Sequence, residues 1–473
     1  MLLEITNHQN ERMTAISEWY ADSWAKRATF EESNYLSQHH ASVLAPGQDF
    51  FLGGFAGTGK STILPGIIER CGLDPISDVA FCAPTGKAAK VMGRKLRDAG
   101  VNAQPTTIHK LIYTPRLPRA EALAREITNL EARITWIEDN DHVDFEDSFH
   151  AEGYDIVEIR SRIDRLTVDL ERMMEGDQDT IQFNLKDRYD FPPEVRLIVV
   201  DEASMCGHDI VNDLAYFGLP ILAIGDPGQL PPVKDKHGFN VKNPDAFLTE
   251  IHRQAKDNPI IYLATRARQG EELKVGDYGD GVEVVLRKND KATLDFTRDA
   301  MLLVGTHRKK WVVTAAIREG LGYVESGPMS GEPLMVCRNS TKIPSLVNGT
   351  IVECMTDHGD LQRGESRFSL RIKNIDEDSE NNPEYNLTVT QPLFEEHVLR
   401  KRGKFTAPSL AAFDANRKCE HLDFAHASTV HKAQGSQWDD VVLHDESGVF
   451  RADAAKWLYT GVTRAAKRLT VVV

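Results

Sequence analysis

The stretch that decides the fold runs from residue 49 to residue 61. It reads Asp49-Phe50-Phe51-Leu52-Gly53-Gly54-Phe55-Ala56-Gly57-Thr58-Gly59-Lys60-Ser61. Its apolar residues predict a short buried strand, and the residues from 54 onward have the spacing G-x-x-x-x-G-K-[ST] of a phosphate-binding loop. Glycines let successive backbone N–H groups converge on an anion, at the positive end of the helix that we expect from residues 61–64. A nucleotide site is the prediction, and a glycine-rich turn without a ligand is the alternative.

The residues of this loop have separate predicted roles. Lys60 is expected to reach the β- and γ-phosphates, and the hydroxyl of Ser61 is expected to ligate Mg²⁺. The predicted nucleotide contacts are Gly54, Gly57, Thr58, Gly59, Lys60, Ser61 and Thr62.

Three further apolar runs, residues 79–83, 197–200 and 221–224, have the length of a strand and each ends in polar or turn residues. Another run, 301–304, leads into a helix that we expect to reach residue 318. Buried strands that end in such loops are typical of a parallel α/β sheet, whose ligand binds outside the carboxyl ends of the strands.

Two of these strand ends carry groups suited to phosphoryl transfer. Asp201 is predicted to hold Mg²⁺, and the adjacent Glu202 is predicted to orient and deprotonate the attacking water. Gln229, in the turn after the next strand, is predicted to hydrogen-bond the γ-phosphate or that water. A polar strand exit and an exposed amide in a Pro/Gly turn are the structural alternatives.

Composition bounds the class of protein. A chain of 473 residues predicts two to four domains. No apolar run approaches the ~18 residues of a membrane span, and the N-terminus lacks a basic, then apolar, leader pattern. The six scattered cysteines contain no C-x-x-C pair and indicate free thiols in a reducing compartment. A cytoplasmic protein is therefore expected.

The net charge of −15, taken alone, disfavours a nucleic-acid partner. Residues 120–190, however, hold 20 Asp and Glu against 8 Lys and Arg, which leaves a net charge of only −3 for the rest. Apolar residues in 123–137 and 159–173 repeat at heptad-like spacing, so this acidic block is predicted to be a helical hairpin with solvated acidic faces. Residues 325–400 instead contain short strand-like runs and predict a small β-barrel.

Several blocks resemble the motifs of superfamily 1 helicases. Residues 200–205 and 225–230 resemble motifs II and III, and residues 428–439 and 457–465 resemble motifs V and VI. Further blocks resemble motif Ia (83–89), the short motif after it (106–110) and motif IV (248–254), and Gln9 resembles the adenine-reading glutamine of the Q motif. The likeness is to the 5′-to-3′ group, with RecD-like and phage Dda-like helicases.

The resemblance implies further site residues. Arg253 and Arg464 would reach the phosphates from a second α/β domain, where a planar, permanently charged fork neutralises developing charge. Gly435 is implied as a further nucleotide contact. The implied DNA contacts are Thr85, Lys87, His109, His431, Lys432 and Trp438, with Phe247 and His307 as additional candidates. For each of these residues, ordinary packing or a surface salt bridge is the alternative.

The implied fold is α/β, with two RecA-like parallel-sheet domains that each carry an insert. Residues 1–119 and 191–234 would form domain 1A, with the acidic helical hairpin 120–190 at the position of subdomain 1B. Residues 235–324 and 405–473 would form domain 2A, with an SH3-like β-barrel, subdomain 2B, at 325–404. The β-hairpin that separates strands in relatives is not recognisable at 1B.

The expected function is an ATP- and Mg²⁺-dependent DNA helicase that translocates 5′-to-3′ on single-stranded DNA and unwinds tailed duplexes, without a membrane partner. Replication or recombination proteins are candidate partners, in the cytoplasm of a bacterium or a phage-infected cell. A motor subunit or translocase that does not unwind alone is one alternative. A nucleotide-dependent switch without a DNA role is the other.

Overall fold

The computed structural model describes residues 5–27, 44–115, 126–132, 134, 159–160, 162–163, 166, 183–232, 235–250, 258–287, 300–340, 342–358, 367–375, 382–390, 394 and 419–473. The chain divides into two compact units. The first comprises Met1–Ile112, Asp187–Thr406 and Lys418–Val473, and the second comprises Tyr113–Lys186 and Ala407–Arg417. Each unit is described by itself.

The first unit contains a six-stranded parallel sheet that carries the phosphate-loop sequence. Its order is β3-β2-β6-β7-β1-β8. The strands are β1 (Asp49–Gly54), β2 (Val79–Ala83), β3 (Thr106–Thr107), β6 (Leu197–Val200), β7 (Ile221–Gly225) and β8 (Ala246–Leu248). The central strands are buried along their length because helices cover the sheet, as the continuous apolar runs predict. The parallel α/β class is thus confirmed.

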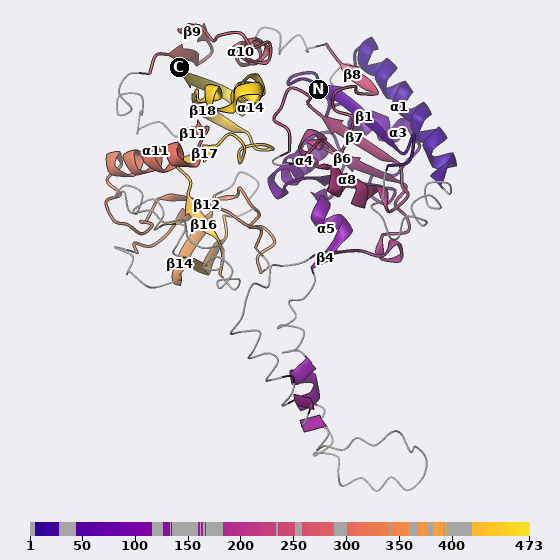
Figure 1. The fold of residues 1–473 in the computed structure, drawn as a ribbon, viewed down its shortest axis with the longest axis horizontal. Helices are drawn as coiled ribbons and strands as arrows, with labels where there is room; N and C mark the ends of the chain where they lie inside the picture. Colours follow the sequence, from indigo (N-terminus) through magenta and orange to yellow (C-terminus); the bar gives the residue numbers. More distant parts are fainter. Residues whose placement is uncertain are drawn as a thin grey trace. The chain divides into compact units, whose positions relative to one another are not determined.

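In the part of the chain that the structure describes, five α-helices accompany this sheet. They are α1 (Asn7–Ala25), α3 (Leu64–Arg70), α4 (Gly86–Asp98), α5 (Ile108–Ile112) and α8 (His208–Ala215). Helix α1 packs against α3 and β8 (Figure 1). Its N-terminus has a capping box, in which Thr6 and Gln9 each bond the backbone of the other.

The sixth strand, β8, departs from the sequence analysis. The sequence analysis predicts that residues 246–248 belong to domain 2A, but these residues pair in parallel with β1 of the first sheet. Ala246 and Leu248 are buried in the same core as Leu52. Burial of these apolar side chains against β1 accounts for the pairing, and a run of three residues is too short to be recognised as a strand.

The helix after the phosphate loop begins later than expected. Residues 60–62 form turns, and α3 starts at Leu64 instead of Ser61. Pro65 explains the shift, because it has no N–H to donate to the carbonyl four residues earlier and is tolerated only in the first turn of a helix. The loop itself closes through N–H bonds of Thr62 and Ile63 to the carbonyl of Gly59.

A second six-stranded sheet lies in the same unit, with the order β17-β11-β18-β19-β10-β9. All its pairs are parallel except β9 with β10. Its strands are β9 (Gly276–Gly279), β10 (Val282–Val285), β11 (Met301–Val304), β17 (Ala427–Thr429), β18 (Trp438–His444) and β19 (Ala465–Val472). Helices α10 (Pro259–Arg268) and α14 (Ala454–Val462) pack together and against β19, whereas α11 (His307–Gly320) packs against β11 and β17.

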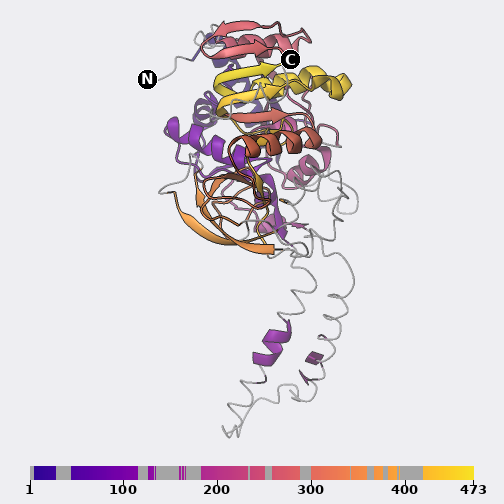
Figure 2. The same cartoon turned by 90° about the vertical axis from the view of Figure 1, so that its left-hand side faces the viewer.

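A five-stranded antiparallel sheet is inserted between α11 and β17. Its order is β15-β14-β13-β12-β16. The strands are β12 (Pro333–Val336), β13 (Ile351–Cys354), β14 (Arg367–Asn374), β15 (Glu384–Thr390) and β16 (Leu422–Phe424). They enclose their own apolar core, and the long orange strands curve along their length in Figure 2. Only residues 425 and 426 separate β16 from β17.

The described part of the second unit begins with a two-stranded antiparallel pair, β4 (Tyr113–Pro115) with β5 (Phe183–Leu185). Of the two predicted heptad-like stripes, the described residues 126–132, 134, 159–160, 162–163 and 166 are helical. Ile134 and Ile159, one from each stripe, are buried, and Arg162 pairs with Glu126 at 2.7 Å. The other stripe residues lie outside the described part of the chain.

None of the described helices has both the length and the apolar character needed to cross a membrane. All six cysteines are free thiols.

Candidate functional site

The phosphate-loop sequence folds into a tight loop after β1. Gly57 and Gly59 have φ values of 80° and 77°, a left-handed backbone that favours glycine. A Cβ at Gly54 would lie 2.7 Å from Oγ1 of Thr58. The Nζ of Lys60 donates to the backbone carbonyls of Gly54 at 2.6 Å and Phe55 at 3.0 Å. The ammonium is thereby held over the loop.

Gln9, which resembles the adenine-reading glutamine of the Q motif, lies against this loop. Its side chain is 3% exposed and its Nε2 donates to the carbonyl of Thr58 at 3.4 Å. Its Oε1 accepts from the backbone N–H of Thr6 at 3.1 Å, so the same amide also caps α1. The geometry is consistent with either role.

The two carboxylates after β6 share a strained turn. Glu202 has a φ of 52°, in the left-handed region, and its N–H donates to Oδ1 of Asp201 at 2.9 Å. Burial, followed by the charge of Glu202, raises the pKa of Asp201, whereas the ammonium groups of Lys95 and Lys60 oppose that rise. Lys95 of α4 also donates to Oγ of Ser61 at 3.3 Å.

This donor set fits a divalent cation bound together with a phosphate. Mg²⁺ prefers oxygen ligands and is held by one or two carboxylates plus substrate phosphates and water, without a protein-only cage. Ser61 and Asp201 supply a hydroxyl and a carboxylate, and the pKa of Asp201 is raised by burial and by a second carboxylate, a situation that a bound cation relieves. Among the described residues there is no cluster of three or more His, Cys, Asp or Glu, so a metal would need non-protein ligands.

The loop after β7 contributes two buried polar side chains. Gln229 is 5% exposed, and its Oε1 has no hydrogen-bond partner within the described residues. Such an orphaned acceptor is rare in a native interior, and its amide is suited to bind a ligand there. Asp226 is 2% exposed and accepts from the N–H of Gly228 at 2.9 Å. Burial raises the pKa of Asp226, and the ammonium of Lys60 opposes this.

Tyr459 of α14 joins the two parallel sheets at this loop. Its hydroxyl donates to Oδ2 of Asp226 at 2.5 Å and accepts from the N–H of Ala56 at 2.8 Å. Burial and the Asp226 carboxylate raise the pKa of Tyr459 well above its usual value. A second connection forms nearby, where the N–H of Leu230 donates to Oγ1 of Thr460 at 3.1 Å. The phosphate loop and the second sheet are therefore in direct contact.

Of the two arginines predicted to reach the phosphates, the structure describes only Arg464. Arg253 lies outside the described residues. Arg464 is 6% exposed, and its guanidinium donates to the carbonyls of Thr460 and Ser436, both at 3.0 Å, and to Oγ1 of Thr463 at 3.1 Å. These contacts hold Arg464 against the C-terminal end of α14 and the loop between β17 and β18.

Several predicted DNA contacts gather where α4 meets the β17–β18 loop. Thr85 caps α4 by accepting from the N–H of Ala88 at 3.1 Å. Gly435, with a φ of 73°, faces the same turn, since a Cβ there would lie 3.2 Å from Oγ1 of Thr85. The Nζ of Lys87 lies 5.8 Å from the ring centroid of Trp438. Gly435, predicted as a nucleotide contact, thus contacts the end of α4.

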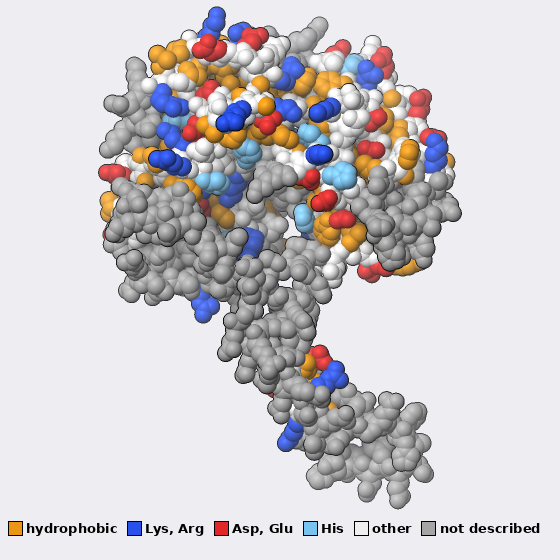
Figure 3. All heavy atoms as spheres, viewed as in Figure 1, with side chains coloured by type: hydrophobic (Ala, Val, Ile, Leu, Met, Phe, Trp, Pro, Cys, Tyr) orange, Lys and Arg blue, Asp and Glu red, His pale blue; other side chains and the backbone are white. Residues whose placement is uncertain are grey.

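The remaining candidates lie nearby along the chain. Lys432 is half-buried and donates to Sγ of Cys337 at 3.1 Å. Burial lowers the pKa of His431, so a DNA contact by its ring at neutral pH would rest on hydrogen bonding or stacking. His109 lies in α5 and is exposed. Lys, Arg and His side chains are spread over the described part of the face in Figure 3, so the net negative charge is not uniform over the surface.

Phe247 and His307 occupy structural positions. The Phe247 ring packs on Phe55, with centroids 4.9 Å apart, and a Cβ at Gly53 would lie 2.8 Å from it. Phe247 therefore packs on the phosphate loop, and its contact with DNA stays a prediction. His307 opens α11 and its ring lies 5.7 Å from that of Trp311.

Sequence reasoning missed three residues at this site. Asp226 and Tyr459 both lie inside the quoted motif-like blocks. A carboxylate or an aromatic hydroxyl at these positions could have been recognised as a candidate site residue. Arg268 of α10 places its guanidinium carbon 3.5 Å from the ring centroid of Phe55. No local pattern marks Arg268.

Comparison with known proteins gives two family matches. Residues 38–286, more than half of the chain, match the model described as AAA domain. The chain belongs to this AAA domain family. Outside the AAA domain, residues 424–472 match the UvrD-like helicase C-terminal domain, a range that begins at the last residue of β16 and contains β17, β18 and β19.

Among curated relatives, the ATP-dependent RecD2 DNA helicase of Deinococcus radiodurans is 26% identical over 470 residues, covering 94% of this chain and 50% of its own. An uncharacterized protein of Methanocaldococcus jannaschii is 23% identical over 491 residues, covering 89% of this chain and 36% of its own. The chain thus spans half or less of these relatives. The crystal structure of Pif1 helicase from Candida albicans is 18% identical, with a TM-score of 0.42 over 90% of this chain and 91% of that one. The AAA domain, the UvrD-like match and the RecD2 relative confirm the resemblance to RecD-like superfamily 1 helicases.

Proposed function

We propose that this protein is an ATP-dependent DNA helicase that translocates on single-stranded DNA in the 5′-to-3′ direction and couples ATP hydrolysis to duplex unwinding. One observation carries the proposal: the hydroxyl of Tyr459, in helix α14 that packs on the second sheet, bonds both the phosphate loop at Ala56 and the carboxylate of Asp226 in the loop after β7 of the first sheet. Because Tyr459 contacts the phosphate loop directly, a change in the distance between the two sheets would change the position of that loop. Hydrolysis can then be converted into motion.

The proposed chemistry divides among the first sheet's residues. Lys60 and the loop N–H groups hold the phosphates, Ser61 and Asp201 hold Mg²⁺, and Glu202 orients and deprotonates the attacking water. The unpaired Oε1 of Gln229 suits a contact to that water. Bound Mg²⁺ would supply charge neutralisation between the β- and γ-phosphates. Gln9 would read the adenine, and Arg253 and Arg464 would approach the phosphates on closure.

The proposed DNA track follows the junction of α4 with the β17–β18 loop. Thr85, Lys87, His109, His431, Lys432 and Trp438 would contact the strand through its phosphates and by stacking on its bases. The Gly435–Thr85 and Lys87–Trp438 contacts support this placement, since both join one sheet to the other. Movement between the sheets would thereby alter the grip on the strand.

The domain organisation is also a proposal. The first parallel sheet corresponds to domain 1A, extended to include β8, and the second corresponds to domain 2A. The five-stranded antiparallel sheet would be the SH3-like subdomain 2B, and the acidic residues 120–190 would stand at the position of subdomain 1B. The family resemblance supports the 5′-to-3′ polarity. The proposed setting is the cytoplasm of a bacterium or phage-infected cell, with replication or recombination proteins as candidate partners.

The decisive experiment measures ATP hydrolysis by the whole chain with and without single-stranded DNA, and then unwinding of duplexes with a 5′ or a 3′ tail. We expect DNA-stimulated hydrolysis and unwinding from the 5′ tail. Lys60→Ala should abolish hydrolysis and leave DNA binding measurable. Unwinding only from a 3′ tail would refute the polarity, and unchanged turnover in Lys60→Ala would refute the site.

The same assays separate the alternatives. DNA-stimulated hydrolysis without strand displacement would identify a translocase or a motor subunit that needs partners. Hydrolysis that DNA does not stimulate would favour a nucleotide-dependent switch. Both outcomes would end the helicase proposal.

A further inference from the structure

We propose that Arg268 contacts the terminal phosphate of the bound nucleoside triphosphate, and that it senses whether that phosphate is present. This inference rests on the proposed nucleotide site, and it assigns a role to a residue outside every motif-like block. The argument starts from the position of Arg268. It is the last residue of α10, a helix that Asn258 caps and that packs on α14 of the second sheet.

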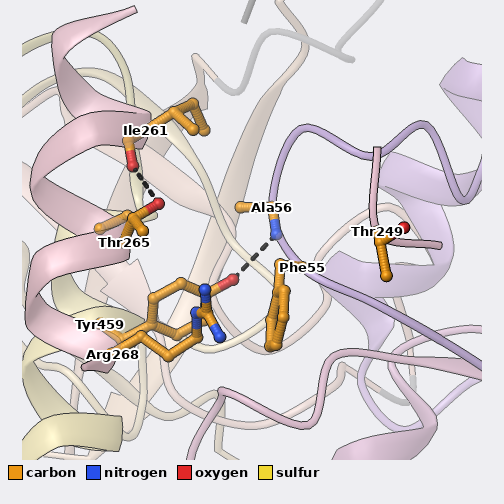
Figure 4. A pocket seen from close by; sticks show the side chains of 8 residues that line it. Phe55, Ala56, Thr249, Ile261, Thr265, Arg268 and Tyr459 are labelled. Carbon is orange, nitrogen blue, oxygen red and sulfur yellow. Dashed lines mark hydrogen bonds between the residues drawn. The ribbon is translucent and has the colours of Figure 1, made fainter. Parts of the chain in front are cut away.

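The guanidinium of Arg268 lies on the phosphate loop. Its Cζ is 3.5 Å from the ring centroid of Phe55, the second residue of that loop. Figure 4 shows the Arg268 side chain beside Tyr459, with the guanidinium directed to the Phe55 ring. The carbonyl of the same Phe55 accepts from Nζ of Lys60 at 3.0 Å. Arg268 of α10 thus contacts the side chain of Phe55, the same residue whose carbonyl helps to hold the phosphate-binding lysine.

Arg268 also reaches the loop that carries Gln229. A Cβ built on Gly228 would lie 3.1 Å from Cδ of Arg268 and 2.9 Å from Cε1 of Tyr459. Glycine is therefore required at residue 228 for this approach. The predicted γ-phosphate contact, Gln229, is the next residue, and its Oε1 is unpaired within the described chain. Arg268 contacts both loops between which a terminal phosphate would lie.

Its guanidinium has unused hydrogen-bonding capacity. Among the described residues, Arg268 has no carboxylate partner and no hydrogen bond, and its contact with Phe55 is a cation–π contact. Arg266, two residues earlier on the same helix, differs because it pairs with Glu271 at 2.8 Å. Arg464 likewise donates to three oxygens of its own loops.

There is space for the side chain to turn. A cavity of about 130 Å³ adjoins it, lined by Phe55, Ala56, Thr249, Ile261, Ala264, Thr265, Arg268 and Tyr459. A cation–π contact contributes ~0.5–2 kcal/mol, whereas charge-assisted bonds from a planar fork to phosphate oxygens are stronger and directional. A γ-phosphate would therefore draw the guanidinium from Phe55, and the shift would report its presence to α10 and the second sheet.

The test compares affinities for a triphosphate and a diphosphate in the full chain, with ATPγS and ADP as probes and no DNA present. Arg268→Ala and Arg268→Lys should weaken ATPγS binding about 10-fold or more, as for loss of a charged hydrogen bond, and leave ADP binding within about 3-fold. Arg268→Met keeps the aliphatic packing on Gly228 and should behave like Arg268→Ala. Arg266→Ala is the matched control and should change neither affinity.

Two results would overturn the inference. One is an unchanged ratio of ATPγS to ADP affinity in Arg268→Met. The other is equal loss of both affinities in Arg268→Lys, which indicates a purely structural role for the Phe55 contact. The affinity measurement needs neither DNA nor hydrolysis. If the wild-type chain does not unwind DNA, the helicase proposal fails, but the ratio of ATPγS to ADP affinity can still be measured. A wild type that binds neither probe overturns both.

Discussion

The hydroxyl of Tyr459 lies 2.5 Å from Oδ2 of Asp226, and this hydrogen bond joins the second parallel sheet to the first. Both groups are buried, with Tyr459 at 1% and Asp226 at 2% exposure. The same hydroxyl accepts from the N–H of Ala56, so a single oxygen connects the phosphate loop, the loop after β7 and α14. Loss of that oxygen leaves the buried Asp226 carboxylate and the half-buried N–H of Ala56 without this partner.

Tyr459→Phe should therefore destabilise the chain. Burial without a partner costs ~1–3 kcal/mol for each polar group, and we expect a loss of that order in the free energy of unfolding, measured by urea denaturation. Tyr262→Phe is the control, because that residue is 48% exposed and, among the described residues, its hydroxyl accepts only a surface bond from Arg266. Equal stability of Tyr459→Phe and wild type would contradict the assigned contact.

Asp49, at the start of β1, should make stability depend on pH. Burial, with a smaller effect of Asp245, raises the pKa of Asp49 from 3.8 to about 6. The folded chain then binds this proton more tightly than the unfolded chain, so the contribution is favourable at low pH and is lost as pH rises through 6. Asp49→Asn cannot ionise and should be more stable than wild type at pH 7.5.

That advantage of Asp49→Asn should shrink at pH 5, where Asp49 of the folded wild type is mostly protonated. Urea midpoints of the two proteins at both pH values give the comparison, in which other carboxylates cancel. A difference that stays constant between pH 5 and pH 7.5 would show that Asp49 keeps an ordinary pKa.

Lys432→Ala should weaken binding of single-stranded DNA and lower its dependence on salt. Each phosphate contact contributes ~0.7 to the slope of log affinity against log salt for a single strand, and the loss should be similar for all base sequences. Lys467→Ala is the control, since its ammonium pairs with Asp439 at the surface. Identical slopes for Lys432→Ala and wild type would remove Lys432 from the track.

A buried ionic cluster should be essential where the antiparallel sheet meets the second parallel sheet. Glu332, at 0% exposure, accepts from Arg318 at 2.5 Å and contacts Nε2 of His426 at 2.9 Å. Arg318→Met leaves this carboxylate without its cation, which typically costs ~3–5 kcal/mol. Urea denaturation should show that loss, and the double variant Arg318→Met/Glu332→Gln should recover part of it. The guanidinium carbon of Arg318 also lies 4.0 Å from the ring centroid of Phe424, and no recovery would mean that Arg318 acts mainly through this packing.

The strands that position the site were predictable because they combine apolar runs with polar ends. Residues 49–54, 197–200 and 221–225 are examples, and the loops after them carry Lys60, Asp201 and Gln229. Strand β8 was missed because three apolar residues do not show a periodicity. The late start of α3 follows from Pro65. The sequence analysis places the helix start from the phosphate-loop pattern and does not take this proline into account.

The contribution of the second sheet was harder to predict from the sequence. Arg268 and Arg266 are two residues apart on one helix, and only the packing of α10 decides which of them faces Phe55. Tyr459 meets Asp226 from 233 residues away along the chain. Such pairings depend on how the two parallel sheets and their helices pack together, and no short stretch of sequence encodes that.

The direct passage from β16 into β17 has a mechanical consequence. With residues 425 and 426 as the whole linkage, and His426 fixed to Glu332, this joint has little slack. A displacement of the antiparallel sheet would therefore also displace β17, the strand that precedes His431 and Lys432. A force that acts on the antiparallel sheet would thus be transmitted to the proposed DNA-contacting segment, because the connection between the two strands is short.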